Sequence, residues 1–251
     1  MNFDGLKTEY WNRQIARVES LRQKISSRAA ILPGRVIPDD IDLVIGTGRR
    51  IDATIMFIDI CSFSQRASST ADEQEMMIRV LNLFFTEMIR ITEDYGGVVE
   101  KNTGDGLMAY FEDKASGSAG ENSTKCATAC ALTMQASNAN LISSILRASG
   151  VSPIEYRTTL EHGTVTIARI GAPQRFNANV AVGNAANFAS KMLGQVKAEQ
   201  IGMGRAAWLR LPEYWRNNWS NLAPINTGWT YGNPPQPYPL YLYTGRWAKL
   251  I

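Results

Sequence analysis

Residues 52–60, DATIMFIDI, form an almost unbroken apolar run that is interrupted near its end by Asp59. A run of this length and composition predicts a β-strand that is buried on both faces. The next segment, residues 71–97, carries apolar side chains at helical spacing, has acidic residues in its first turn and ends at two glycines. These features predict a long amphipathic helix. A buried strand followed by such a helix favours a fold in which helices cover a central sheet.

The rest of the chain continues this alternation. A leading helix, a candidate dimer contact, is expected over residues 6–30, and residues 37–50 read as a turn without a complete phosphate-binding glycine motif. The further expected elements are a hairpin (98–111), a polar loop (112–123), a helix (124–149), two strands joined by a turn at His162-Gly163 (154–171), a helix in the second half of 177–196, a strand and helix (198–211) and a closing strand (239–245). The order predicts an α+β domain around one sheet. We divide the chain into a lead-in segment, 1–50, and a main domain, 51–251.

Composition excludes several classes of protein. The formal charge is +3 with scattered basic residues, and 20% of residues are charged, so no nucleic-acid groove is expected. No segment is apolar over the roughly 18 residues that a membrane span needs, and the amino end does not resemble a secretion signal. We therefore expect a cytoplasmic protein. Three cysteines do not suggest a disulfide framework or zinc site, and with His162 the only histidine, no mechanism that needs a pair of histidines can operate within one chain.

Two separate carboxylates are expected to meet at one end of the sheet. Asp59 lies near the carboxyl end of the buried strand, and Asp105 lies on the Gly-Asp-Gly turn of the 98–111 hairpin. If the hairpin pairs beside the first strand, both acids converge, and neither has a cationic neighbour in the sequence. Hard oxygen ligands of this kind suit magnesium or manganese. Taken alone, an acid such as Asp59 is more often capped or ion-paired than bound to a metal.

Several motifs occur in order along the chain: FIDICSFS at 57–64, a helix containing LN..F, GG.V.K..GDG.MAYF at 96–111, R.....GTV....IG at 157–171 and GNAANFASK at 183–191. Together they resemble the catalytic domain of the class III nucleotidyl cyclases, from about Asp52 to Tyr243. The resemblance implies a ferredoxin-like βαββαβ fold with a central, mostly antiparallel sheet and flanking helices. It also implies two Mg²⁺ or Mn²⁺ ions per active site.

The family's functional positions can be carried over to this sequence. The resemblance implies that Asp59 and Asp105, with the carbonyl of Ile60, hold the metals, and that Asn187 orients the ribose. Lys191 stands where the family has its transition-state arginine, and Arg169 is a candidate to assist it. The implied substrate-binding residues are Phe57, Phe63, Ser64, Lys101, Asn179, Val180, Asn187 and Lys191. Structural alternatives remain for some of these residues. Phe63 suits a core position equally well, and Lys101 is compatible with a solvated position on a hairpin. Asn187 and Lys191 are compatible with the polar side of a helix.

The resemblance further implies a homodimer with two shared active sites. In this family one chain supplies the metals and the other supplies the asparagine and the cation on the helix. The implied reaction is attack of the ribose 3'-hydroxyl on the α-phosphorus, which forms a 3',5'-cyclic monophosphate and releases pyrophosphate. The product then acts through a separate cyclic-nucleotide-sensing effector. Neither nucleic acid nor a membrane is an expected partner.

The base-reading positions depart from both purine patterns. Lys101 is a hydrogen-bond donor, whereas Val180, at the position that accepts the adenine amino group in adenylate cyclases, cannot accept a hydrogen bond. The combination of a donor at Lys101 with no acceptor at Val180 favours uracil as the base. The chain also resembles the bacterial pyrimidine cyclases of the Pycsar anti-phage system. We therefore expect conversion of UTP to cUMP, with cCMP or cAMP as alternatives. A non-catalytic nucleotide-binding module, favoured by the lysine at 191, is another alternative. A diguanylate cyclase or polymerase-palm relative is more distant, because the Gly-Gly-Asp/Glu-Glu-Phe hairpin is absent.

Overall fold

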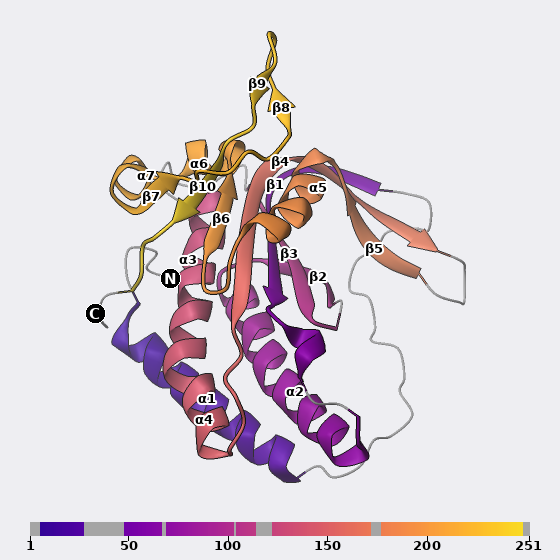
Figure 1. Cartoon of the computed structure of the whole chain (residues 1–251), viewed down its shortest axis with the longest axis vertical. Coiled ribbons are helices and arrows are strands. Elements are labelled where there is room, and N and C mark those ends of the chain that lie inside the picture. Colours follow the sequence, from indigo (N-terminus) through magenta and orange to yellow (C-terminus); the bar gives the residue numbers. More distant parts are fainter. Residues whose placement is uncertain are drawn as a thin grey trace.

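The central sheet of the protein has eight strands and carries helices on both faces (Figure 1). The computed structural model describes residues 6–27, 48–66, 69–102, 104–113, 122–171 and 177–247. The first half comprises α1 (Thr8–Ser27), β1 (Gly48–Ile60), α2 (Ala71–Asp94), β2 (Val98–Asn102), β3 (Gly106–Glu112), α3 (Ser123–Ser137), α4 (Ser143–Ala148) and β4 (Tyr156–Gly171). A π-helical segment, Asn138–Ile142, joins α3 to α4.

The second half extends the sheet and adds the helix α5. Its elements are β5 (Asn177–Val182), α5 (Asn184–Met192), β6 (Ile201–Gly204), α6 (Arg205–Arg210), α7 (Glu213–Trp219), β7 (Ser220–Leu222), β8 (Thr230–Tyr231), β9 (Gln236–Pro237) and β10 (Leu240–Tyr243). The strand order is β2-β3-β1-β4-β6-β10-β7, and β5 pairs with the far end of β4. The β4–β6 pairing is parallel and the others are antiparallel. The expected βαββαβ order and mostly antiparallel sheet are confirmed.

The strand β1 separates two hydrophobic cores. Alternate side chains of a strand point to opposite faces, and Met56, Ile58 and Ile60 enter the larger core, which α1 to α4 cover. Ile51 and Ile55 enter the smaller core beneath α5. Both sets are nearly inaccessible to solvent, which explains the continuous apolar run in the sequence.

The helix α2 has the signals that the sequence predicted. Thr70 accepts a hydrogen bond from the Glu73 amide, and the Glu73 carboxylate accepts from the Thr70 amide, which forms a capping box. At the other end Gly96 has a φ of 76°, a left-handed conformation that glycine adopts at little cost. Both ends of α2 are therefore fixed by these residues. Its apolar side packs against the larger core.

The prediction of a turn at His162-Gly163 is wrong, because this region is one continuous strand. All of β1 pairs with β4, from Gly48 opposite Ala168 to Ile60 opposite Tyr156. A Cβ atom at Gly163 would lie 3.3 Å from the Cβ of Ala185 in α5. The glycine thus allows the helix to approach the sheet closely and does not turn the chain.

The leading helix packs against its own chain. Within the described part of α1, Arg17 forms ion pairs with Glu87 and Asp94 of α2, both at 2.9 Å. The Tyr10 hydroxyl donates to Asp94 at 2.7 Å, and Gln14 donates to the fully buried Glu87 at 3.1 Å. These contacts join α1 to the domain of its own chain, and the expected dimer contact stays a prediction.

Some expectations fall on other parts of the chain. Residues 28–30 of the predicted leading helix, 37–47 of the predicted turn and most of the 112–123 loop lie outside the described residues. Residues 48–50 belong to β1 rather than to a turn, so the strand begins before the boundary expected at 51. No helix in the described ranges combines the length and apolar character needed to cross a membrane.

Two of the three cysteines and five tryptophans in the second half of the chain pack with the hydrophobic cores of the described structure. Cys61, Cys126 and Cys130 form no disulfide within the described residues, and burial raises the pKa of Cys130. Trp208, Trp215, Trp219 and Trp247 pack in the larger core and Trp229 against the smaller one.

Candidate active site

The two aspartates expected to bind metal lie at adjoining ends of neighbouring antiparallel strands. Asp59 of β1 pairs in register with Gly106 of β3, and the Ile60 amide donates to the Asp105 carbonyl at 2.8 Å. The backbone therefore brings Asp59, Ile60 and Asp105 to one edge of the sheet. Since Asp59 is two residues from Phe57, which packs against the smaller core, the Asp59 side chain emerges on the α5 side of the sheet.

Asp59 has a cationic partner that sequence reasoning missed. Arg157 of β4 stands opposite Asp59 in the strand register, and its Nε and Nη2 atoms lie 2.8 and 2.7 Å from Asp59 Oδ2. The two side chains are 30% and 20% exposed, respectively. No described residue hydrogen-bonds or ion-pairs with Asp59 Oδ1 or with the Asp105 carboxylate. One carboxylate oxygen of Asp59 and all of Asp105 are thus available to a ligand.

These two carboxylates fit a divalent cation that completes its shell with substrate. The described residues contain no cluster of three or more Asp, Glu, His or Cys side chains, so no metal cage made by protein side chains is found there. Magnesium characteristically binds through one or two carboxylates together with phosphates and water. The donor set at Asp59 and Asp105 matches that requirement, and a cation at Asp59 would compete with Arg157 for the same carboxylate.

The loop after β1 turns sharply beside the aspartates. Ser62 adopts a left-handed φ of 53° and ψ of 30°, which is uncommon for a residue other than glycine. It leads into a short 3-10 helix, Phe63–Gln65. The half-buried Phe63 side chain packs against the larger core, whereas Ser64 is exposed. Burial raises the pKa of Cys61 in this loop.

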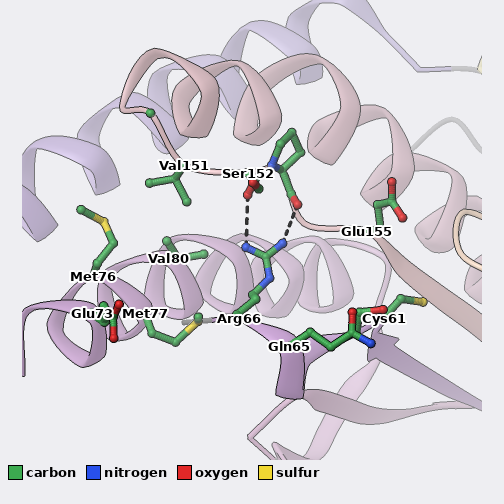
Figure 2. A pocket seen from close by; sticks show the side chains of 13 residues that line it. Cys61, Gln65, Arg66, Glu73, Met76, Met77, Val80, Val151, Ser152 and Glu155 are labelled. Carbon is green, nitrogen blue, oxygen red and sulfur yellow. Dashed lines mark hydrogen bonds between the residues drawn. The ribbon is translucent and has the colours of Figure 1, made fainter. Parts of the chain in front are cut away.

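A cavity of about 510 Å³ lies behind this loop, between the start of α2 and residues 150–155 (Figure 2). Arg66 crosses it and donates to the carbonyls of Ser152 and Pro153. None of the expected site residues lines the cavity, and its methionine and valine side chains come from the larger-core side of the molecule. We therefore assign the candidate active site to the open edge with Asp59, not to this cavity.

The expected base-reading residues lie on β2 and β5, which are close in space. Lys101 of β2 is exposed and its Nζ lies 3.3 Å from Glu100. The side chain of Glu100 is inaccessible to solvent, and burial raises its pKa although the Ala181 amide of β5 hydrogen-bonds to it. Glu100, which sequence reasoning missed, therefore links Lys101 to the strand that carries Asn179 and Val180.

Asn179 and Val180 differ in what they offer a ligand. Both are half-buried in β5, where Asn179 stands opposite Arg169 and Val180 opposite Ala168. The Asn179 Oδ1 atom is buried and lacks a hydrogen-bond partner in the described structure. Because successive strand residues point to opposite faces, only one of the two can face the side that Lys101 occupies.

The helix α5 presents the other expected catalytic residues. Ala185, Ala186, Ala189 and Met192 are buried against the sheet, whereas Asn187 and Lys191 are exposed one turn apart. The backbone of α5 is tied to β4 by the Thr159 hydroxyl, which donates to the Ala189 carbonyl at 2.7 Å. The two polar side chains therefore point away from the sheet, as the spacing predicted, and no described contact joins them to Asp59 or Asp105.

Comparisons with known proteins agree with this architecture. Residues 47–221 match the model of a family described as the adenylate and guanylate cyclase catalytic domain. An adenylate cyclase of Anabaena cylindrica is 27% identical over 185 residues, which cover 70% of this chain and 35% of that protein. The chain thus spans about a third of the length of that relative.

Solved structures show the same fold. The adenylyl cyclase CyaB from P. aeruginosa matches with a TM-score of 0.65 and 21% identity, covering 82% of this chain and 100% of that one. The guanylyl cyclase Cya2 matches with a TM-score of 0.64 and 21% identity, covering 81% and 98%. Since the family match spans more than half of the sequence, this chain belongs to the adenylate and guanylate cyclase catalytic domain family.

Proposed function

We propose that this chain is a nucleotidyl cyclase that converts UTP to cUMP and pyrophosphate. The observation that carries the proposal is the placement of Asp59 and Asp105 at adjoining strand ends, with acceptor oxygens that no described residue occupies. Membership of the cyclase family supports the reaction type. The choice of uracil depends on the side chains of β2 and β5.

The chain's own side chains suit an intramolecular attack on a phosphate. Asp59, Asp105 and the Ile60 carbonyl would hold divalent cations, which neutralise the triphosphate and lower the pKa of the ribose 3'-hydroxyl when bound. Asn187 can hydrogen-bond the ribose, and Lys191 can stabilise the charge that develops on the α-phosphate. Arg157 also donates from Nη1 to the Val196 carbonyl at 3.4 Å, and once a cation shares Asp59, its Nε and Nη2 atoms can donate to phosphate oxygens.

The base preference follows from hydrogen-bonding capacity. Lys101 donates and cannot accept, and Val180 can do neither. The unpartnered Oδ1 of Asn179 adds an amide that can both donate and accept. Uracil offers two carbonyl acceptors and one ring N–H donor, a set that a lysine and an amide can satisfy. Adenine instead requires an acceptor for its amino group at the position that Val180 occupies, and Val180 cannot accept a hydrogen bond, so ATP is the weaker candidate and CTP the intermediate one.

A homodimer with two shared sites is part of the proposal. The end of β4 and β5 form an arm that projects from the body of the domain (Figure 1). Ile170 and Val182 on this arm are each 52% exposed, an apolar surface that association would cover. In a closed two-fold arrangement, Asn187 and Lys191 of one chain would complete the site at Asp59 and Asp105 of the other.

A non-catalytic nucleotide-binding module is the second candidate, because Lys191 lacks the planar, bidentate donor geometry of an arginine. The decisive test is incubation of the purified chain with each of the four nucleoside triphosphates and Mn²⁺ or Mg²⁺, with products identified by mass. We expect cUMP as the main product and none from Asp105→Asn. Binding without any cyclic product would support the second candidate, and a dominant cAMP or cGMP product would refute the uracil assignment.

The shared site is tested by mixing two inactive variants. Asp59→Asn and Asn187→Ala chains should each lose activity, whereas an equal mixture should recover about a quarter of the wild-type rate, because half of the dimers would be mixed and each of those would contain one intact site. No recovery in a mixture that forms mixed dimers would refute the shared site. An Ile170→Glu variant should weaken both dimerisation and activity while it remains folded.

We also propose that the product serves anti-phage signalling through a separate effector. The support is the resemblance to Pycsar pyrimidine cyclases and the pyrimidine-compatible side chains. Cells that carry the intact gene and its effector should resist phage, whereas cells with the Asp59→Asn chain should not. Equal protection by both chains would show that cyclisation by this protein is not required for defence.

A further inference from the structure

A segment outside the family match packs on the helix that carries Asn187 and Lys191. The match ends at residue 221, and residues 223–238 then return across the smaller core, where Ala223 is buried and Trp229 contacts the cluster beneath α5. The segment includes the β8–β9 hairpin, which extends beyond the sheet (Figure 1). The contacts of this segment with α5 indicate a role other than extension of the sheet.

Three aromatic rings connect this segment to α5. The Phe188 ring stacks on Trp229, with ring centroids 5.3 Å apart and an angle of 28° between planes. It also stacks on Tyr238, at 5.0 Å and 26°. Aromatic pairs of this geometry contribute about 0.5–1.5 kcal/mol each beyond their buried area. Phe188 is thus held by two rings from a segment 41 to 50 residues further along the chain.

The two rings are themselves held firmly. The Tyr238 amide donates to the Trp229 carbonyl at 2.7 Å, and the Thr227 hydroxyl donates to the Tyr238 carbonyl at 2.8 Å. The Tyr238 hydroxyl donates to Glu161 of β4, a carboxylate that is only 1% exposed. Burial raises the pKa of both Glu161 and Tyr238.

Glu161 connects the aromatic group to the centre of the sheet. Its Oε1 atom accepts from the amides of His162, at 2.8 Å, and Ala207, at 3.1 Å. A Cβ atom on Gly204 would collide with the Glu161 carboxylate, so the glycine leaves room for it. A series of contacts, from Phe188 through Tyr238 to Glu161, therefore links α5 to β4 and α6. These contacts do not involve the sheet-facing side of α5.

On its sheet-facing side, α5 is held by the hydrogen bond from Thr159 to the Ala189 carbonyl and by mostly short side chains. Three of its four buried residues are alanines, whose short side chains make few contacts that resist rotation about the helix axis. Phe188 lies next to Asn187 and three residues before Lys191, so any rotation that moves one ring moves both polar side chains. Displacement of a catalytic group by about 1 Å can reduce the rate about 100-fold.

We propose that residues 223–238 form a clamp that fixes the orientation of α5, with Phe188, Trp229 and Tyr238 as positioning residues for cyclisation. This inference depends on the proposed function for its effect on turnover. The clamp acts through helix orientation rather than through contact with the nucleotide. Its loss therefore reduces kcat much more than it raises KM.

The experiment measures kcat and KM for the best nucleoside triphosphate and the hydrogen exchange of α5. We expect Phe188→Ala to lower kcat about 10- to 100-fold with less than about a threefold change in KM, and Phe188→Tyr to retain most of the activity. Trp229→Ala should act similarly, and the double variant should lose little more than either single one, because the residues act as a unit. Amide exchange within 184–192 should become faster in Phe188→Ala and remain unchanged in β1.

The matched control is Trp208→Ala. Trp208 stacks on Tyr241 at 4.2 Å in the larger core, so its loss removes a similar aromatic pair without touching α5. We expect its kcat to stay near the wild-type value. Equal loss of kcat in both variants, or unchanged kcat and unchanged α5 exchange in Phe188→Ala, would overturn the clamp.

Failure of the proposed function would look different. If Asn187→Ala keeps full turnover, the assignment of α5 to catalysis is wrong, whatever the clamp does. Hydrogen exchange of α5 in Phe188→Ala still decides whether the clamp holds the helix. Faster exchange in Phe188→Ala alongside a fully active Asn187→Ala would retain the clamp and reject the catalytic role.

Discussion

Two aspartate–arginine pairs stand at opposite ends of β1, and they differ in how completely each acid is satisfied. Asp59 and Arg157 lie at the carboxyl end, with 2.7 Å between Arg157 Nη2 and Asp59 Oδ2. Asp113 and Arg210 lie at the amino end, where the Asp113 amide bonds to the Asp52 carbonyl and Arg210 Nη2 is also 2.7 Å from the carboxylate. The ion pairs alone do not distinguish the two sites.

The surroundings of the acids do distinguish them. Asp113 Oδ1 also accepts the Ser123 amide at 3.1 Å, and Oδ2 lies 3.7 Å from His162 Nε2. Burial acts to raise the pKa of Asp113, but the bonds from Ser123 and the charge of Arg210 outweigh it and hold that pKa below its usual range. In the described structure Asp59 has no partner beyond Arg157. An acid such as Asp113, whose two oxygens both have protein partners, stabilises the fold. An acid such as Asp59, with one oxygen lacking a described partner at an open edge, can bind a cation.

The largest expected effect is on Asp59. Asp59→Asn keeps the size of the side chain but removes the charge that would hold a cation, so we expect cyclase activity to fall about 1,000-fold or more, a loss of roughly 4 kcal/mol of transition-state stabilisation. The free energy of unfolding should change by less than about 1 kcal/mol, because the pair with Arg157 is partly exposed. Product formation and urea unfolding measure the two quantities. Activity near wild type in this variant would place the metals elsewhere.

The second prediction concerns Arg157. Arg157→Ala frees Asp59 for the cation but removes a donor to phosphate, and we expect kcat/KM to fall about 10- to 100-fold, equivalent to roughly 1.4–2.7 kcal/mol. The apparent affinity for the activating Mn²⁺ should rise because its competitor is gone. Titration of the rate with Mn²⁺ and with substrate separates the effects. Weaker Mn²⁺ activation would mean that Arg157 orients Asp59 instead of competing for it.

The third prediction is the converse at the other end of β1. Asp113→Asn leaves Arg210 without its counter-charge and weakens the bond from Ser123, so we expect about 1–3 kcal/mol of destabilisation. Turnover per folded molecule should remain within about twofold of wild type. Urea denaturation monitored by tryptophan fluorescence, with activity measured on the same samples, provides the check. A loss of turnover as large as that in Asp59→Asn would erase the distinction between the two acids.

The smallest effect is a pH dependence from His162. Burial lowers the pKa of His162, and Arg210 lowers it further, while Asp113 and Asp52 act to raise it. The unfolded chain therefore binds the proton first as the pH falls below about 6.5, so stability is full above that pH and is lost as the pH decreases. His162→Asn should reduce this loss between about pH 7 and 5 by no more than about 1 kcal/mol. An unchanged slope of unfolding free energy against pH would assign the effect to other groups.

Local sequence signals predicted most of the fold. The capping residues Thr70 and Glu73, the glycines after α2 and the apolar periodicity act over a few residues, so they can be read from the sequence. The prediction of a turn at His162-Gly163 was wrong because contacts with distant residues decide the conformation there. A histidine-glycine pair is typical of turns, but the thirteen residues of β1 impose an extended partner strand, and α5 uses the glycine for close approach. Tertiary pairing overrode the local preference.

The candidate site was predictable in part. Spacing alone indicated that Asn187 and Lys191 share an exposed side of a helix, and the convergence of Asp59 and Asp105 needed only the assumption that the hairpin pairs with the first strand. Phe63 was ambiguous because a phenylalanine suits a core and a ligand equally well. Glu100 and Arg157 were missed because charged residues within strands carry no local signal of their partners.

The sequence by itself determined the alternation of strands and helices, the turn that carries Asp105 and the polar pair on α5, because each depends on interactions between near neighbours. Only the tertiary structure decided that Arg157 faces Asp59, since that contact joins residues 98 positions apart through strand register. It also decided that Phe188 lies between Trp229 and Tyr238. Such contacts depend on how whole elements pack, and a residue's type does not encode which distant element it will meet.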